Sequence, residues 1–304
     1  MKPLRFVISL VNRENDYQIA QAKAAEEAGK RLGIQVDIQF ADGDAIEQSQ
    51  QLLQVVQSSS SAHCDGILLQ PVGTGLHRVA EAAAAAGIGW VVMQREVEYA
   101  SELQQKYKVP VFTVSSDHEE EGRIQGRQLA ALLPHGGNVL CIQGPSGDPI
   151  TDSRLSGLNQ AKPDNVQVRT IRGKWTEQSG SEAISHWLRL STSQQQTTDA
   201  IVSQNDVMAM GARKALNGLS DNALRDKLME VPILGCDGLP ASGQAWVRQH
   251  LLTATVVVQA FAGTAMEMLA TAIHTKKLPQ EHTVFAPASL PPLNELRPVA
   301  NVKA

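Results

Sequence analysis

Apolar runs of strand length alternate with stretches of helical spacing along almost the whole chain. Residues 5–11 form a short apolar run, which predicts a strand. Residues 17–32 instead repeat alanine on one helical stripe, and Gly33 follows as a helix-ending glycine. The same pattern predicts strands at 5–11, 36–40, 66–69, 91–93, 111–114, 138–142, 166–171, 200–203, 231–235 and 253–258, and helices at 17–32, 45–57, 75–86, 118–133, 152–161, 177–190, 206–217, 239–250 and 261–276.

Strands that alternate with helices predict parallel sheets with helices on both faces. About ten strands in one chain fit two sheets better than one, so the sequence predicts an α/β fold with two such sheets. The polar stretch Ser115–Glu121 follows the fifth strand, and we place the first crossing between the two lobes there. The tail after Leu278 carries five prolines, which predicts mostly irregular chain wrapped on the surface.

Composition narrows the class of protein. The chain has 304 residues, which suggests about two domains at roughly 150 residues each. Hydrophobic residues make up 42% and charged residues 19%, as in globular proteins. With 27 Lys and Arg against 31 Asp and Glu, the chain has no cationic excess to neutralise phosphates, so nucleic acid is not expected as a partner. No apolar run approaches the roughly 18 residues of a membrane span.

The start of the chain and its cysteines bear on the compartment. The apolar part of residues 1–11 is too short for the core of a secretory signal, and no small-residue cleavage site follows. The expectation is therefore either a cytoplasmic protein or an extracytoplasmic one whose leader has been removed. Cys64, Cys141 and Cys236 are far apart and odd in number, which predicts buried free thiols rather than a disulfide framework or zinc site.

The common catalytic and cofactor motifs are missing. No G-x-G-x-x-G follows a strand, and Gly144-Pro145-Ser146-Gly147 lacks the Gly-Lys-Ser/Thr ending of a phosphate-binding loop. The sequence also contains no G-x-S-x-G and no H-E-x-x-H. His118 and the three glutamates after it are typical of a charged helix start, whose carboxylates complement the helix dipole. We therefore predict no cofactor, no metal and no catalytic residues.

Polar and aromatic side chains follow nearly every predicted strand. In open parallel sheets ligands bind outside the carboxyl ends of the strands. Planar hydrogen-bonding groups with aromatic rings suit a neutral polyhydroxylated ligand, because rings cover its C–H faces while Asp, Asn and Arg bind adjacent hydroxyls. The candidate ligand-binding residues at these strand ends are Asn15, Tyr17, Gln70, Gln94, Arg95, Asp148, Arg154, Trp175, Asn205 and Asp237.

Most of these candidates could instead have a purely structural role. Asn15 or Asp16 could cap the first helix, and Asn205 or Asp206 could cap a later one, with Asp206 the better capping residue. Tyr17 and Trp175 could serve only in packing. Surface ion pairs could join Arg95 to Glu96 and Arg154 to Asp152, and Asp237 before Gly238 could be a turn residue.

Six segments give the chain a family resemblance: VISLVNRENDYQ, GILLQPVGTG, VVMQRE, GPSGDPITDSRLSG, SQNDVMAMGARKAL and GCDGLP. Over residues 5–275 the chain resembles the type I periplasmic sugar-binding proteins, the ribose- and galactose-binding kind. The pattern N-D-x-M-A-x-G-A followed by G-x-D-G-x-P is fairly specific to them. The resemblance implies ligand contacts from the strand-end residues, Trp175 as the stacking ring, and a further contact from Gln259, or from Val258 if the alignment slips by one.

The resemblance also implies the architecture and the departures from it. The fold would be two doubly wound lobes joined by a three-segment hinge near 115–118, 236–238 and 257–260. The lobes would comprise 1–116 with 258–280, and 117–257 with 281–304. Gln94 stands where the family usually has Asp, Gln18 where a second aromatic is common, and Gln70 where Asn or Asp is usual. The class of ligand follows from the family, and its identity does not.

Three functions stay open at this point. The leading one is non-enzymatic capture of a monosaccharide or related polyol between the lobes by hinge closure, read by an ABC transporter permease or a membrane sensor, with the protein a monomer. The second is a sugar-sensing module; only residues 1–4 precede the first strand, so no DNA-reading domain is expected. The third is a hydrolase or other sugar-modifying enzyme.

Overall fold

The computed structural model describes residues 3–58, 63–190 and 197–299. Contacts divide the chain into two compact units. Unit 1 comprises Met1–Ser116 and Ala260–Phe285, and unit 2 comprises Asp117–Gln259 and Ala286–Ala304. The expected crossing near 236–238 is wrong, because unit 2 continues without interruption to Gln259. The chain passes between the units after Ser116, after Gln259 and after Phe285. Residues 258–259 therefore belong to unit 2 and residues 281–285 to unit 1, the reverse of the expectation.

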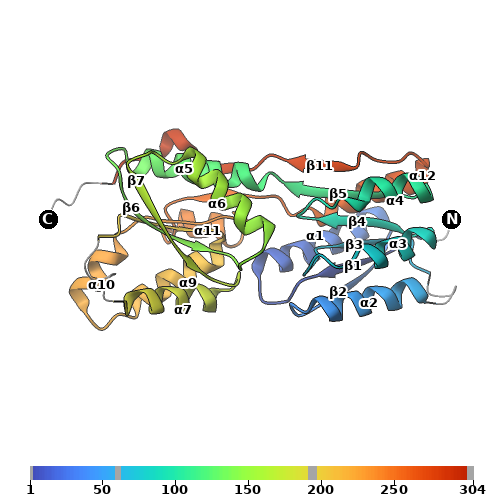
Figure 1. Cartoon of the computed structure of the whole chain (residues 1–304), viewed down its shortest axis with the longest axis horizontal. Coiled ribbons are helices and arrows are strands. Elements are labelled where there is room, and N and C mark those ends of the chain that lie inside the picture. The colour runs from blue at the N-terminus through green and yellow to red at the C-terminus, as the bar shows by residue number, and fades with distance from the viewer. Residues whose placement is uncertain (1–2, 59–62, 191–196, 300–304) are drawn as a thin grey trace. The chain divides into compact units, whose positions relative to one another are not determined.

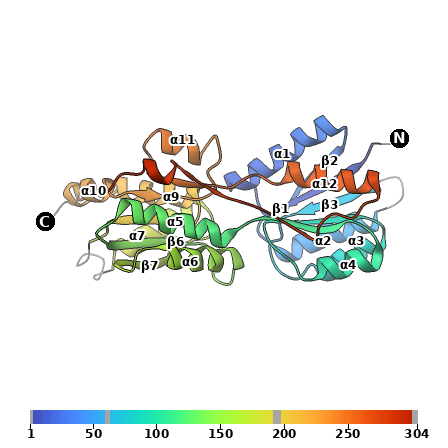
Figure 2. The ribbon, with the colours of Figure 1, turned by 90° about the horizontal axis from the view of Figure 1, so that it is seen from above.

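Unit 1 is a parallel sheet with helices on both faces (Figure 2). Its strand order is β11-β5-β4-β3-β1-β2, and β1 pairs in parallel with both β2 and β3. Helices α1 and α12 cover one face and α2, α3 and α4 the other. The bounds are β1 Arg5–Leu10, α1 Asp16–Leu32, β2 Gln35–Phe40, α2 Ala45–Gln57, β3 Gly66–Leu69, α3 His77–Ala85, β4 Gly89–Met93, α4 Tyr99–Tyr107, β5 Val111–Ser116, α12 Ala262–Thr275 and β11 His282–Phe285.

Unit 2 repeats the plan with fewer strands (Figure 1). Its parallel sheet has the order β7-β6-β8-β9, with α5 and α6 on one face and α7, α9 and α10 on the other. A separate antiparallel pair joins β10 to β12. The bounds are α5 His118–Leu132, β6 Gly137–Gln143, α6 Pro149–Ala161, β7 Val166–Arg172, α7 Glu177–Leu188, β8 Ala200–Ser203, α9 Asp206–Asn217, α10 Asn222–Met229, β9 Ile233–Leu234, α11 Gly243–Arg248, β10 Thr255–Val257, β12 Ala288–Leu290 and the 3-10 turn η2 Leu293–Glu295.

Helices on both faces of each sheet explain why its central strands are mostly buried. In β1, alternate residues point to opposite faces, and both faces are covered by helices, so the residues from Phe6 to Leu10 are all buried. The strand orders reverse direction at β1 in unit 1 and at β6 in unit 2. At such a reversal the loops leaving adjacent strands go to opposite faces, which opens a crevice at the carboxyl edge.

The prediction of irregular chain after Leu278 is wrong in part. Residues His282–Phe285 form β11, which pairs with β5, and Ala288–Leu290 form β12, which pairs with β10. Both strands are proline-free segments between the prolines, and both lie at a sheet edge, where neighbouring prolines remove no ladder hydrogen bond.

The remaining differences concern short elements. Helices α4 and α10 have no counterpart in the prediction, and α11 and β9 are shorter than the segments expected at 239–250 and 231–235. Among the described residues, no helix combines the length and the hydrophobicity that a membrane span requires.

Candidate functional site

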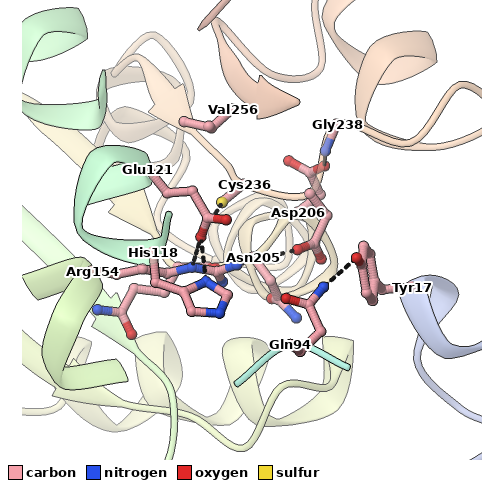
Figure 3. Close-up of polar contacts among 12 residues, drawn as sticks. Tyr17, Gln94, His118, Glu121, Arg154, Asn205, Asp206, Cys236, Gly238 and Val256 are labelled. Carbon is pink, nitrogen blue, oxygen red and sulfur yellow. Dashed lines mark hydrogen bonds and ion pairs between the residues drawn. The ribbon is translucent and has the colours of Figure 1, made fainter. Parts of the chain in front are cut away.

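The first turn of α1 contains two of the predicted residues. Asn15 is the N-cap, and its Oδ1 accepts hydrogen bonds from the backbone N–H of Tyr17 at 2.8 Å and of Gln18 at 3.4 Å. Tyr17 is 5% exposed, and its hydroxyl accepts a hydrogen bond from Gln94 Nε2 (Figure 3). The capping role of Asn15 is therefore real, and it fixes the position of the tyrosine ring at the carboxyl edge of the sheet.

Two further strand ends of unit 1 join this group. Gln94 follows β4 with a φ of +70°, a conformation that non-glycine residues rarely adopt. Arg95 beside it donates from Nη1 to the carbonyl oxygen of Gly73 at 3.3 Å. Gln18 Nε2 donates to Gln70 Oε1 at 2.8 Å, so the first turn of α1 is tied to the loop after β3.

In unit 2, Trp175 links three loops. Its Nε1 donates to Asp148 Oδ2 at 3.1 Å, while Oδ1 of the same carboxylate caps α6. Its carbonyl oxygen accepts from Asn205 Nδ2 at 3.1 Å. The ring packs so closely on Gly144 that a Cβ there would lie 2.1 Å from it. The loops after β6, β7 and β8 are therefore held together around one indole.

Arg154 is the charged centre of unit 2. It lies on α6 and is 5% exposed. Its Nε donates to Glu121 Oε2 at 2.5 Å and its Nη1 to the carbonyl oxygen of Gln204, while Nη2 lies 3.8 Å from Asp237 Oδ1. Its Cζ lies 5.7 Å from the centroid of the Trp175 ring. In place of the surface pairing considered with Asp152, Arg154 pairs with Glu121 (Figure 3), which is fully buried.

The loop after β9 presents Asp237 with a φ of +113°. This conformation is supported by Asp206, whose Oδ2 accepts from Gly238 N at 2.7 Å and whose Oδ1 accepts from Thr255 Oγ1 at 2.7 Å. Asn205, rather than Asp206, caps α9. The expectation that Asp206 is the better capping residue is wrong, because its carboxylate is already engaged by the neighbouring loop.

Sequence reasoning missed Glu121 and His118. Glu121 is fully buried, and His118 Nδ1 lies 3.0 Å from its Oε2. Their segment was interpreted only as a charged helix start. Helical spacing could have predicted that Glu121 is buried, because Gln125, Gln128 and Leu132 follow it on the same buried stripe of α5.

The remaining predicted contact lies at the end of unit 2. Gln259 is exposed, whereas Val258 is buried and donates its backbone N–H to the carbonyl oxygen of Asp237 at 2.9 Å. A ligand contact from Gln259 stays a prediction. No group of three or more metal-ligating side chains occurs within residues 3–58, 63–190 and 197–299.

The three cysteines are buried and free, as predicted. Burial raises the pKa of the Cys64 thiol to about 11 and that of Cys141 to about 12. Burial also raises the pKa of Cys236 well above its ordinary value, against the opposing charge of Arg154. Burial by itself lowers the pKa of the Arg154 guanidinium, but the acidic groups around it outweigh burial, so it stays a cation.

Known proteins are similar to this chain in sequence and in fold. Residues 6–277 match the family model described as a periplasmic binding protein domain. The ribose import binding protein of Bacillus subtilis is 25% identical over 287 residues, which cover 93% of this chain and 85% of that protein.

Two solved structures have the same fold. One is a periplasmic solute-binding protein of an ABC transporter from Actinobacillus succinogenes with bound D-allose, with a TM-score of 0.79, 20% identity and coverage of 95% of this chain and 97% of that one. The other is an ABC transporter solute-binding protein from Bacillus halodurans with bound myo-inositol, with a TM-score of 0.78, 22% identity and coverage of 96% and 95%. The fold is therefore that of the type I periplasmic binding proteins.

Proposed function

Because this chain belongs to the periplasmic binding protein family, we propose that it is a non-enzymatic solute-binding protein that captures a monosaccharide or related polyol. The observation that carries the proposal is the group formed by Asp148, Trp175, Arg154 and Asp237 at the carboxyl edge of unit 2. An indole beside a guanidinium and two carboxylates offers an apolar face and charge-assisted hydrogen bonds, which together recognise a ring bearing hydroxyls.

Unit 1 contributes a second group of side chains of similar chemistry: Asn15, Tyr17, Gln70, Gln94 and Arg95. We propose that both groups, together with Gln259, contact one ligand, and that its binding favours a closed arrangement by population shift. Gln94 and Gln70 provide amides where the family commonly has acids or smaller amides, so the pattern of hydroxyls bound here differs from that of ribose or glucose.

Transport is the proposed output. The relatives named above serve ribose import or belong to ABC transporters, and an extracytoplasmic location goes with that family. The partner we propose is therefore the permease of an ABC transporter, approached by a monomeric binding protein. Because the reaction required is binding and release, the ligand should leave the protein chemically unchanged.

A thermal-shift screen over pentoses, hexoses, cyclitols and small glycosides tests the proposal. A ligand at 100 times its dissociation constant adds about 2.7 kcal/mol to the free energy of unfolding. At roughly 2–4 °C per kcal/mol for chains of 150–250 residues, the unfolding midpoint should rise by several degrees. Lack of any shift across the whole panel would contradict sugar binding, and recovery of a chemically altered sugar after incubation would favour an enzyme.

A further inference from the structure

Glu121 is a buried acid in direct contact with the ligand-binding arginine. Its side chain is fully buried, and its Oε2 accepts from Arg154 Nε at 2.5 Å. The same oxygen lies 3.0 Å from His118 Nδ1 and 4.0 Å from Cys236 Sγ (Figure 3). Glu121 and Arg154 therefore form a buried ion pair.

These contacts determine which side of the guanidinium is available. Nε is engaged by Glu121, and Nη1 donates to the carbonyl oxygen of Gln204. Nη2 lies 3.8 Å from Asp237 Oδ1, too far for a hydrogen bond. Arg154 is thus held on its Nε side, and its Nη2 donors point toward the loop that carries Asp237.

The guanidinium of Arg154 lies close to two carboxylates, those of Glu121 and Asp237. Without Glu121, Arg154 would face Asp237 alone at the long distance given above. With Glu121 present, two carboxylates surround one guanidinium, and both are nearly or completely buried. In a buried setting a charge is weakly screened, so one additional carboxylate changes the potential that an incoming ligand meets.

We propose that Glu121 is a positioning and specificity-determining residue: it orients Arg154 and, together with Asp237, gives the group around Arg154 an excess of negative charge, so that the site accepts uncharged sugars and rejects their carboxylate-bearing counterparts. This inference rests on the proposed function. Without the carboxylate of Glu121, the guanidinium would be balanced by Asp237 alone and would repel the carboxylate of a sugar acid less.

The test compares one neutral sugar, a hit of the thermal-shift screen, with the matched uronic acid. Equilibrium affinities for both are measured by calorimetry in the wild-type protein and in Glu121→Gln, which keeps the shape of the side chain and removes its charge. The ratio of the neutral to the acidic affinity should fall at least tenfold in the variant. A change in packing alone would weaken both ligands together and leave the ratio unmoved.

Glu120→Gln is the matched control. Glu120 is the preceding residue on α5 and is 31% exposed, and its carboxylate pairs with Arg123 and Arg127 instead. This control should keep the wild-type ratio. An unchanged ratio in Glu121→Gln, or an equal change in Glu120→Gln, overturns the inference.

If Glu121→Gln is too unstable for calorimetric titration, its thermal unfolding midpoint is measured instead, with each ligand present in excess. The advantage of the neutral sugar over the acid in raising the midpoint should then be smaller than in wild type, and an undiminished advantage overturns the inference. If the wild-type protein binds no neutral sugar, the proposed function itself fails. If the wild-type protein binds a neutral sugar but Glu121→Gln leaves the affinity ratio unchanged, only the role assigned to Glu121 is refuted, and the proposed function stands.

Discussion

Arg154 and Trp175 follow different strands in the sequence, and the structure brings them against each other. The principle that strand ends converge was enough to select both side chains. It was not enough to find Glu121, whose contact with Arg154 depends on how closely α5 and α6 pack. The choice of helix cap was missed for a similar reason. Local sequence does not reveal that the Asp206 carboxylate accepts a hydrogen bond from the backbone N–H of Gly238 and so does not cap α9.

Trp175 offers a graded test of the stacking role. Trp175→Ala should lower sugar affinity at least about tenfold, or ~1.4 kcal/mol, because both the ring face and the bond to Asp148 are lost. Trp175→Phe keeps a ring and should lose less. Calorimetric titration measures both, and Trp187→Ala, on α7 of the same unit, serves as the control. Normal binding by Trp175→Ala would mean that the ring does not face the ligand.

Cys141 should make stability depend on alkaline pH. Burial raises the pKa of this thiol from 9.0 to about 12, so the folded protein retains a proton that the unfolded chain releases. The contribution to the free energy of unfolding is complete below pH 9 and is lost as the pH rises toward 12.

Denaturant titrations of wild type and Cys141→Ala between pH 8 and 11 measure this effect. The wild-type free energy of unfolding should fall more steeply with pH than that of the variant. Parallel curves would show that the thiol ionises inside the folded protein as easily as outside it.

Helices α5 and α6 approach each other through glycine. A Cβ at Gly157 would lie 1.9 Å from the carbonyl oxygen of Glu119, and one at Gly122 would lie 2.0 Å from that of Arg154. Backbone atoms cannot move aside as a side-chain end can, so these glycines set the distance between the helices. That distance is what lets Glu121 on α5 reach Arg154 on α6.

Gly157→Ala should therefore destabilise the protein by at least the ~1–3 kcal/mol typical of overpacking. Gly218→Ala is the control, because its nearest atom beyond its neighbours lies 3.5 Å from the added Cβ. Urea unfolding compares the two variants. Equal midpoints would mean that the helices can separate without cost.

Periodicity located the long helices and the buried strands, since their patterns extend over several turns or pairs. It failed for α4, α10, β11 and β12, which are short and partly exposed. A strand such as His282–Phe285 is stabilised mainly by its partner β5, which lies far earlier in the chain, and no local pattern reports such a pairing.

The two units share the end of the chain. β11 completes the sheet of unit 1, while β12 pairs with β10 and Leu296 enters the core of unit 2. The family model ends at residue 277, before these strands. The segment after Leu278 therefore adds a strand to each unit, although its prolines predicted mostly irregular chain on the surface.

Two truncations separate these roles. A chain ending after Gln280 loses β11 and β12, whereas one ending after Phe285 loses β12 and η2 but keeps β11. Hydrogen exchange should show β5 deprotected only in the shorter chain, and β10 deprotected in both, because each strand loses its paired neighbour. Full protection of β5 in the shorter chain would mean that β11 adds nothing to its sheet.

The late position of β11 has a consequence for biosynthesis. The segment up to Ser116 contains only five of the six described strands of the first sheet, and the sixth, β11, is synthesised after every strand of the four-stranded second sheet. β10 likewise waits for β12. Neither unit therefore has all of its described strands until the segment carrying β11 and β12 has been synthesised, so the first sheet stays one strand short while the second is made.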